Sequence, residues 1–290
     1  MSRTAYVNGR YVPHDRARVH IEDRGYQFAD GVYEVIAVVG GRMVDAAGHF
    51  TRLERSLGEI EVPMPMSRAA LRVVLDETIR RNRVRDGIVY LQITRGTARR
   101  NHAFPPADRR PALVVTARGM TFPTDAETTP GVKVVTVPDI RWGRCDIKTV
   151  GLLPNVLAKQ RAAEAGAYEA WLVDAASGAV TEASSSNAWI IDAEGRVVTR
   201  PKSNAILGGI TRESVLRLAR DAGIAVEERA FTLDEALAAR EAFITSTTSF
   251  VKPVVRIDET VIGNGEPGAT TRRLLALYLA HVRDPGEAAA

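Results

Sequence analysis

The segment GMTFPTDAETTPG (residues 119–131) constrains the fold of this chain more than any other. It is rich in threonine, proline and glycine and has no hydrophobic periodicity, whereas the sequences on either side carry regular apolar patterns. Such a stretch is typical of a loop between structured regions. Because 290 residues are enough for about two domains, we interpret the segment as a domain boundary. The sequence therefore predicts a small N-terminal domain at residues 1–120, a linker at residues 121–131 and a larger C-terminal domain at residues 132–290.

Strand and helix patterns are mixed in the predicted N-terminal domain. Residues 8–9 (Asn-Gly) and 40–41 (Gly-Gly) each separate two β-prone runs, which is a hairpin signal. Apolar residues recur at helical spacing over residues 50–60 and again after Ser67, and they predict two helices. Two further predicted strands have the sequences GIVYLQITRG and PALVVTARG.

The C-terminal half is predicted to contain further strands and three helices. The helices are expected at about residues 154–165, at GGITRESVLRLARDAG and at residues 271–282. In the middle helix, Thr211 is expected to cap the start and Gly223 the end. The predicted strands are VKVVTVP, EAWLVDA, AWIIDA, RVVTRP, AFITSTT and FVKPVVRID. Because strands and helices do not alternate as strict βαβ units, we assign the α+β class, and we expect the terminal PGEAAA to be frayed.

Charge and composition narrow the possible functions. A net charge of +4 suggests nucleic-acid binding, but acidic residues alternate with the basic ones, as is typical of solvated helix faces. No apolar stretch approaches the about 20 residues that span a bilayer. The single cysteine, Cys145, indicates a reducing compartment, and the first residues have no secretory pattern. We expect a cytoplasmic protein that binds neither nucleic acid nor membrane.

Two other sequence signals carry little weight. The five histidines are scattered without metal-ligand spacing, so we predict no metal site. The sequence GNGEPG (263–268) has the spacing of a dinucleotide-binding loop, but Pro267 stiffens a loop that would have to follow a pyrophosphate closely. We predict a turn at this position.

Lysine is scarce in this sequence. Only five of the 39 basic residues are lysines, and Lys148 follows an apolar residue, Ile147, ahead of a small-residue turn. Arginine stays protonated, whereas lysine can lose its proton and become an amine that forms imines. Lys148 is therefore a candidate for imine chemistry, although a solvated charge at this position would need no function. An imine-forming lysine needs a carbonyl partner, and pyridoxal 5'-phosphate is the leading candidate.

Pyridoxal phosphate needs an acid beside its ring nitrogen, donors for its phosphate and a site for the carboxylate of the amino acid. Glu182, in TEASSSNAWII, is a candidate for the acid, although a glutamate there also suits an exposed turn. The sequence GGITRES places the N–H groups of Ile210 and Thr211 at a helix start, where anions bind. The sequence TSTTS (245–249) adds hydroxyl groups. Each of these signals is weak alone, because helix caps and threonine-rich loops are common.

The order of the motifs is more specific than any one of them. DRGYQFADGVYEV, TRG followed by RRNH, DIK, TEASSSN, LGGITR and TSTTS resemble the fold-type IV pyridoxal-phosphate transaminases, and most of all the D-amino-acid aminotransferases. The resemblance extends from about Tyr6 to Tyr278. It implies a smaller N-terminal α/β domain and a larger C-terminal cofactor-binding domain with a barrel-like β core.

The resemblance also implies which residues bind the cofactor. Lys148 would join to it covalently and move the proton at the substrate Cα, and Glu182 would pair with the ring nitrogen. The remaining contacts, to the phosphate and to the face of the ring, would come from Arg52, Leu207, Ile210, Thr211 and Thr247.

In the D-specific branch of this family, the substrate α-carboxylate is bound by a set of residues that Tyr33, Arg100 and His102 match. Arg100 and His102 lie in a proline-flanked loop, where such residues usually have no function, but an arginine fork suits a carboxylate. The chain departs from the best-known members at Ala183, at Pro154 and in SFVKPV (249–254). These departures leave the chemistry intact and put the side-chain preference in doubt.

The expected activity is a ping-pong transamination that moves the amino group of a D-amino acid such as D-alanine to a 2-oxo acid such as 2-oxoglutarate, giving D-glutamate. The resemblance implies a homodimer in which the loop with Arg100 and His102 reaches the neighbouring subunit. Enzymes of the same fold remain alternatives: an (R)-amine transaminase, a branched-chain aminotransferase or an aminodeoxychorismate lyase. A basic nucleic-acid-binding protein is the alternative from another class.

Overall fold

The computed structural model describes residues 3–106 and 108–284, and the chain divides into two compact units. The first unit comprises residues 3–121 together with Ile147–Gly151, and the second comprises Phe122–Asp146 and Leu152–Asp284. The linker expected at residues 121–131 stays a prediction. The segment that contains Lys148 groups with the first unit, although it follows the first strand of the second unit in the sequence.

The first unit is built from short strands and two long helices. In chain order its elements are β1 (Thr4–Val7), β2 (Arg10–Pro13), the 3-10 helix η1 (His14–Arg16), α1 (Arg24–Phe28), β3 (Gly31–Val39), β4 (Arg42–Met43), α2 (Ala46–Glu59), α3 (Arg68–Arg81), β5 (Gly87–Thr94) and β6 (Ala112–Gly119).

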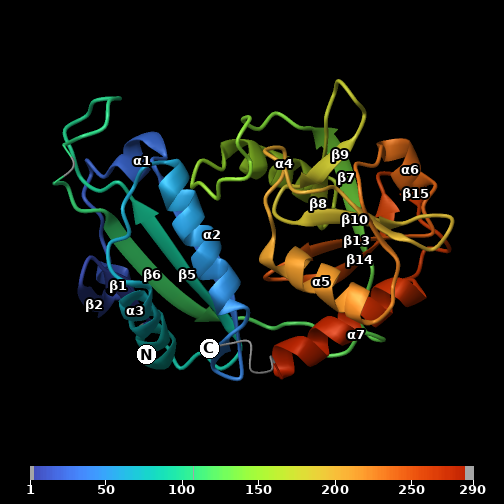
Figure 1. Ribbon diagram of the computed structural model, residues 1–290, viewed down its shortest axis with the longest axis horizontal. Helices are drawn as coiled ribbons and strands as arrows, with labels where there is room; N and C mark the ends of the chain where they lie inside the picture. The colour runs from blue at the N-terminus through green and yellow to red at the C-terminus, as the bar shows by residue number, and fades with distance from the viewer. Residues whose placement is uncertain (1–2, 107, 285–290) are drawn as a thin grey trace. The chain divides into compact units, whose positions relative to one another are not determined.

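Within the described residues, the sheet of the first unit has six antiparallel strands in the order β2-β1-β6-β5-β3-β4, with α2 and α3 packed against it (Figure 1). Both expected hairpins are present, and their turns use backbone conformations with positive φ at residues 8–9 and 40–41, which asparagine and glycine adopt readily. Side chains such as Ile36, Leu53 and Leu75 are fully buried between helices and sheet. Burying one such side chain contributes about 1.5–3 kcal/mol.

The second unit contains most of the strands of the chain. Its elements are β7 (Val132–Pro138), α4 (Leu153–Glu164), β8 (Glu169–Val173), β9 (Val180–Ala183), β10 (Asn187–Ile191), β11 (Val197–Thr199), α5 (Ile210–Asp221), β12 (Val226–Glu228), α6 (Leu233–Leu237), β13 (Glu241–Ser246), β14 (Phe250–Ile257), β15 (Thr260–Val261) and α7 (Ala269–Arg283).

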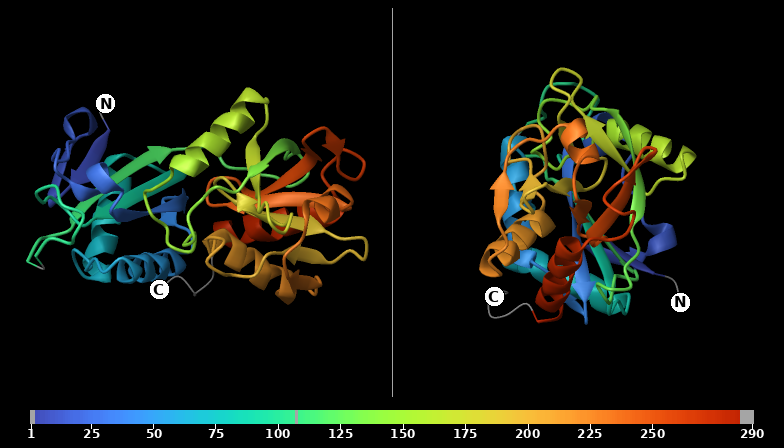
Figure 2. Two further views of the ribbon diagram at one scale, coloured as in Figure 1. Left: turned by 90° about the horizontal axis from the view of Figure 1, so that it is seen from above. Right: turned by 90° about the vertical axis from the view of Figure 1, so that its right-hand side faces the viewer.

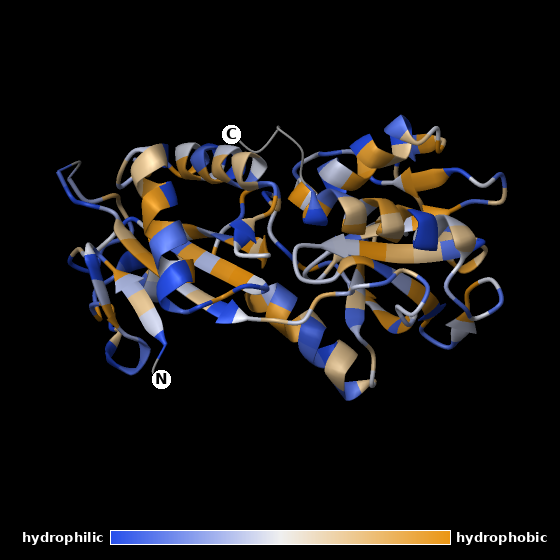
Figure 3. Cartoon of the chain, turned by 90° about the horizontal axis from the view of Figure 1, so that it is seen from below, coloured by the Kyte–Doolittle hydropathy of each residue, from blue (hydrophilic) through white to orange (hydrophobic). Residues whose placement is uncertain are grey.

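Its sheet has the order β12-β11-β10-β13-β14-β7-β8-β9, with β15 paired to β14, and it curls strongly in the views of Figure 2. Parallel pairing joins β7 to β8 and to β14, whereas β10 and β13 are antiparallel. All five residues of β10 are buried, which explains why AWII reads as a continuous apolar run in the sequence. Both hydrophobic and hydrophilic residues recur along the helices in Figure 3.

The α+β class and the curled sheet of the larger unit are confirmed, and one predicted detail is wrong. Gly209, not Thr211, is the N-cap of α5, because Gly209 has extended backbone angles and Thr211 already lies inside the helix. Gly223 follows the helix with a positive φ, as expected. The predicted frayed tail, PGEAAA, is residues 285–290 and lies outside the described part of the chain. No helix among the described residues combines the length and apolar character that crossing a bilayer requires.

Candidate active site

Lys148 is held against the start of β3 by its backbone. The amide of Tyr33 donates to the carbonyl oxygen of Lys148 over 3.0 Å, and the amide of Val150 donates to the carbonyl oxygen of Gly31 over 3.1 Å. Ile147, directly before the lysine, is buried in the core of the first unit. The apolar residue that precedes Lys148 in the sequence is therefore an anchor, and it fixes where the lysine side chain begins.

The side chain of Lys148 lies over an aromatic ring. Its Nζ atom is 4.3 Å from the ring centroid of Tyr33, a contact that attracts a cation to the face of the ring. The amide of Lys148 donates to Oγ of Ser56 on α2 over 3.4 Å. Arg52 lies one turn earlier on the same helix. The structure thus brings three of the predicted site residues, Lys148, Tyr33 and Arg52, to the start of β3.

Arg52 is fixed by a buried carboxylate. Its Nε and Nη2 atoms each donate to Glu34 over 2.7 Å, and Nδ1 of His49 lies 2.7 Å from Oε2 of the same carboxylate. Glu34 and His49 are 1% and 3% exposed. A bidentate ion pair of this kind fixes the plane of the guanidinium. The edge that carries Nη1 points away from Glu34.

Burial and charge set the protonation states in this cluster. Burial would raise the pKa of Glu34, but the charge and hydrogen bonds of Arg52 outweigh it and lower the pKa to about 2. Burial lowers the pKa of His49, and the Glu34 carboxylate opposes this effect only in part. At neutral pH the ring of His49 is therefore neutral, and its Nδ1–H donates to Glu34.

Arg100 and His102 lie together on the loop that follows β5. The guanidinium of Arg100 is 4.6 Å from the ring centroid of Phe28, and the ring of His102 is 5.3 Å from the same centroid. Both residues are exposed. Within the described residues, no hydrogen bond joins Arg100 or His102 to Tyr33 or Lys148. The structure therefore groups the predicted carboxylate-binding residues of this loop with each other, and Tyr33 with the lysine.

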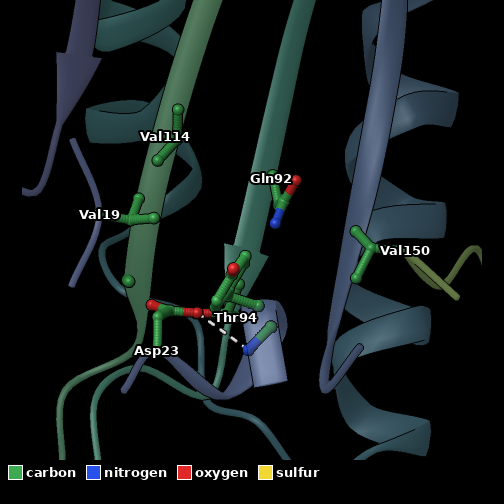
Figure 4. A pocket seen from close by; sticks show the side chains of 9 residues that line it. Val19, Asp23, Gln92, Thr94, Val114 and Val150 are labelled. Carbon is green, nitrogen blue, oxygen red and sulfur yellow. Dashed lines mark hydrogen bonds between the residues drawn. The ribbon is translucent and has the colours of Figure 1, made fainter. Parts of the chain in front are cut away.

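A pocket of about 320 Å³ lies in the first unit at the start of α1 (Figure 4). Asp23 forms one side of it, where Oδ1 accepts from the amide of Gly25 and Oδ2 from the hydroxyl of Thr94. Gln92, on another side, is the direct cross-strand partner of Tyr33, so both side chains lie on the same face of the sheet. Val150, two residues after Lys148, also lines the pocket.

The second unit contains a buried group of charged residues around Glu182. Arg141 makes an ion pair with Glu182, and it also binds Asp139 through Nε (2.9 Å) and Nη2 (2.7 Å). The side chains of all three are at most 12% exposed. Burial would lower the pKa of Arg141, but the hydrogen bonds and charges of the two carboxylates raise it. Because the group has two carboxylates and one guanidinium, it carries a net negative charge, and this charge favours the binding of a further cation.

Glu182 is also connected to the start of α5. Its carboxylate accepts from the amide of Leu207 (3.1 Å) and from Nδ2 of Asn187 (3.0 Å), which in turn donates to the carbonyl oxygen of Leu207. A Cβ atom on Gly209 would lie 2.1 Å from Oδ1 of Asn187, so a larger residue there would displace the Asn187 side chain from these contacts. The structure therefore brings together Glu182, Leu207 and the first turn of α5.

The start of α5 has the properties of an anion site. The first N–H groups of a helix have no partner within the helix, and no side chain among the described residues caps this one. Ile210 and Thr211 are the first two helical residues. Their N–H groups and the positive end of the helix dipole favour a bound anion. Thr247, the last residue predicted for the phosphate, lies in the tight turn between β13 and β14.

One departure in SFVKPV, Phe250, has a structural role. Phe250 is 1% exposed, and its ring stacks on Phe122 with 4.6 Å between the centroids. It has a positive φ of 58°, an unusual conformation for a bulky residue. Lys252 is half-buried, and burial lowers its pKa. Phe250 therefore serves the core of the second unit.

Sequence reasoning missed several residues that support the predicted ones: Glu34, His49, Asp139, Arg141 and Asn187. Glu34 had a detectable signal, because a charged residue in the buried strand GVYEVIAVV needs a partner. His49 and Arg52 share a face of α2 at helical spacing and supply that partner. Arg141 had no such signal, since RWGR lies in an irregular segment. The described residues contain no group of three or more metal-ligating side chains that could hold a metal ion.

Comparisons with known proteins extend over nearly the whole chain. The family model "Amino-transferase class IV" matches residues 31–257. A D-alanine aminotransferase of Bacillus licheniformis is 44% identical over 270 residues, which are 92% of this chain and 93% of that protein. A D-alanine aminotransferase of Listeria monocytogenes serotype 4b is 40% identical over 95% of both chains.

Solved structures show the same fold. A branched-chain amino acid aminotransferase of Escherichia coli superposes with a TM-score of 0.87 at 22% identity, covering 97% of this chain and 94% of the other. A second branched-chain amino acid aminotransferase, from T.th. and solved with pyridoxamine 5'-phosphate, gives a TM-score of 0.88 at 28% identity, with 98% and 96% covered. The family model matches most of the chain, and relatives above 30% identity span more than nine-tenths of it. The chain belongs to the class IV aminotransferases.

Proposed function

We propose that this chain is a D-alanine aminotransferase, which converts D-alanine and 2-oxoglutarate into pyruvate and D-glutamate by a ping-pong cycle. The observation that carries the proposal is the identity of 40–44% to D-alanine aminotransferases over more than nine-tenths of the chain. The branched-chain enzymes of similar fold are only 22–28% identical. The Arg100-Asn101-His102 sequence further supports a D-amino-acid substrate.

The residues present fit the family's cofactor, pyridoxal 5'-phosphate. The cofactor supplies an aldehyde that joins to amines and a ring that withdraws electrons from the substrate Cα. The first unit offers the amine of Lys148 and the oriented guanidinium of Arg52. The second offers the buried carboxylate of Glu182 and the uncapped start of α5. The cofactor needs an amine, a carboxylate that can face its protonated ring nitrogen, and donors for its phosphate. These residues supply all three.

Each residue has a separate task in the proposed reaction. Nζ of Lys148 removes the proton from Cα of the D-amino acid, and its fixed backbone keeps that atom on one side of the substrate. Glu182 would keep a proton on the ring nitrogen through the charge of its carboxylate, which Arg141, Asn187 and the amide of Leu207 hold in place. Tyr33, Arg100 and His102 bind the α-carboxylate. Arg52, Ile210, Thr211 and Thr247 bind the phosphate, and Leu207 supports the ring.

The proposal includes assembly and location. A homodimer would bring the loop with Arg100 and His102 to the neighbouring subunit, and size-exclusion chromatography with light scattering measures the mass directly. A cytoplasmic location agrees with the single cysteine, which a reducing compartment keeps as a thiol. Cell fractionation tests that part.

The function is tested by a panel of amino donors with 2-oxoglutarate as the acceptor. We expect fast formation of glutamate from D-alanine and little from L-alanine, L-leucine or an (R)-amine, with the product in the D configuration. A faster reaction with L-leucine would favour the branched-chain alternative, and a faster reaction with the (R)-amine would favour an amine transaminase.

The role of Lys148 is tested by chemical labelling. Reduction of the cofactor-loaded enzyme with borohydride, followed by peptide mapping, should place the label on Lys148. The Lys148→Ala variant should keep its fold by circular dichroism and lose nearly all turnover. A label on Lys159, the nearest other lysine in the sequence, would contradict the assignment.

A further inference from the structure

Arg24, the first residue of α1, is buried and binds the backbone of the loop that carries Arg100 and His102. Its Nη1 atom donates to the carbonyl oxygens of Asn101 (2.5 Å) and Ala103 (3.3 Å), and Nη2 donates to that of His102 (3.3 Å). Arg24 is 3% exposed, although the loop residues themselves are exposed. One guanidinium thus holds three successive carbonyl groups of residues 100–104, which we call the trap loop.

The guanidinium is itself fixed by a carboxylate shared with a second arginine. Nε of Arg24 donates to Oδ2 of Asp30 over 2.7 Å, and Nε of Arg95 donates to the same oxygen over 2.7 Å. Arg95 also donates to the carbonyl oxygens of Ile60 (2.6 Å) and Glu61 (3.0 Å), just after α2. The trap loop is therefore connected through buried charges to the end of a long helix.

Phe28, at the end of α1, provides a second contact with the same loop. The guanidinium of Arg24 lies 4.9 Å from its ring centroid, and the side chains of Arg100 and His102 lie against the same ring. The short helix α1 thus carries both an arginine that binds the backbone of the loop and a ring that contacts its two functional side chains. Its other end, at Asp23 and Gly25, forms the wall of the pocket in Figure 4.

We propose that Arg24 is a positioning residue for substrate selection: it holds the trap loop in the one conformation in which Arg100 and His102 bind a carboxylate. The inference rests on the proposed function. An exposed loop of this kind would otherwise sample many conformations, and ordering it on binding would reduce affinity. Arg24 provides this order before substrate binds, so its effect appears only with substrates that carry a carboxylate.

The first experiment measures the loop without any substrate. Trypsin cleaves after Arg99 and Arg100, and the fixed loop should protect both bonds in the holoenzyme. We expect Arg24→Met to increase the cleavage rate at these two bonds about tenfold, and Arg24→Lys to increase it less, because an ammonium can still reach some of the carbonyls. Arg72→Met removes the same charge from the exposed face of α3 and serves as the control, with unchanged cleavage. Equal protection in Arg24→Met and wild type would overturn the proposal.

The second experiment separates carboxylate recognition from the rest of the reaction. D-Alanine and D-alaninol differ only in the carboxylate, and each can be followed in a single turnover by the absorbance of the bound cofactor. We expect Arg24→Met to raise the half-saturating concentration of D-alanine about tenfold, as the loss of one or two charge-assisted contacts would do, and to change that of D-alaninol less than twofold. The rate at saturation should change little for either donor. Equal changes for the two donors, or none for D-alanine, would overturn the proposal.

A reference variant distinguishes the failure of this inference from the failure of the proposed function. Arg100→Ala should show the same selective loss for D-alanine. If wild type transaminates D-alanine but Arg100→Ala binds it normally, the trap loop does not select the carboxylate, and the inference about Arg24 fails while the activity stands. If wild type does not react with D-alanine, the proposed function fails, and the proteolysis experiment still decides whether Arg24 orders the loop.

Discussion

At the scale of single residues, buried charge determines how this protein responds to acid. His49 is neutral in the folded chain because burial lowers its pKa below the ordinary value of 6.5. The unfolded chain binds a proton at this residue as the pH falls below 6.5, and the folded chain does not. The contribution of His49 to the free energy of unfolding is therefore fully present above pH 6.5 and is lost progressively as the pH falls below it. For Glu34 the corresponding loss lies between pH 4.5 and about 2.

The first prediction uses this separation of pH ranges. Between pH 7 and pH 5.5, the His49 effect should lower the free energy of unfolding by up to about 1 kcal/mol. His49→Asn, which keeps a donor near the position of Nδ1, should remove most of that slope in urea titrations. The control is His20→Asn, at an exposed position. An unchanged slope in His49→Asn would show that folding does not lower the pKa of His49.

The second prediction concerns Cys145. Burial is the main cause that raises the pKa of this thiol, to about 11, and Arg141 opposes it only in part. At pH 8, roughly one thiol in a thousand would then be ionised. We expect the native protein to react with Ellman's reagent far more slowly than the same protein unfolded in urea. Equal rates in the two states would show that the thiol is neither buried nor shifted.

At the scale of elements, the sequence predicted the long helices and most of the strands, and it missed the short helices η1, α1 and α6 and the strands β9, β12 and β15. Periodicity identifies α2 and α3 because each repeats an apolar face over several turns. It cannot identify α1, which has five residues and depends on the side chain of Asp23 at its start. The three-residue strand β12 is likewise set by pairing with β11, a contact outside its own sequence. The short helix α1 nevertheless carries Arg24, so function here depends on an element that local sequence does not specify.

The third prediction concerns the buried group that joins elements of the second unit. Arg141 connects Asp139 after β7, Glu182 in β9 and the carbonyl oxygen of Ala205. Arg141→Met would leave two carboxylates buried without their cation, so we expect a loss of about 3 kcal/mol in the free energy of unfolding. Urea unfolding measures it. Arg196→Met, which removes a partly exposed ion pair with Asp192, should cost less than about 1 kcal/mol. Similar losses in the two variants would mean that the Arg141 group is not effectively buried.

At the scale of the whole molecule, the ten predicted site residues are divided equally between the two units. Motif order was enough to predict nine of them, because each of those lies in a short recognisable segment, and Arg52 followed only from the resemblance to the family. Their supporting partners could not be named in the same way. Arg141 and Glu182 are 41 residues apart, and Arg24 reaches carbonyl groups more than 75 residues away. Such pairs are created by tertiary packing, and a single sequence contains no local pattern that marks them.

The last prediction tests the proposed assembly through the chemistry. If the trap loop serves the neighbouring subunit, each site takes Lys148 from one chain and Arg100 from the other. Lys148→Ala and Arg100→Ala homodimers should both be poorly active with D-alanine. After the two are mixed and their subunits exchange, each mixed dimer should contain one intact site, so activity should return to roughly a quarter of the wild-type value. Lys148→Ala mixed with Glu182→Gln is the matched control: these two residues are proposed to act in the same site from the same chain, so every site in the mixture stays defective. If subunit exchange, followed with two different tags, restores no activity in the first mixture, then Arg100 does not act across the subunit boundary, and the trap loop must serve its own chain.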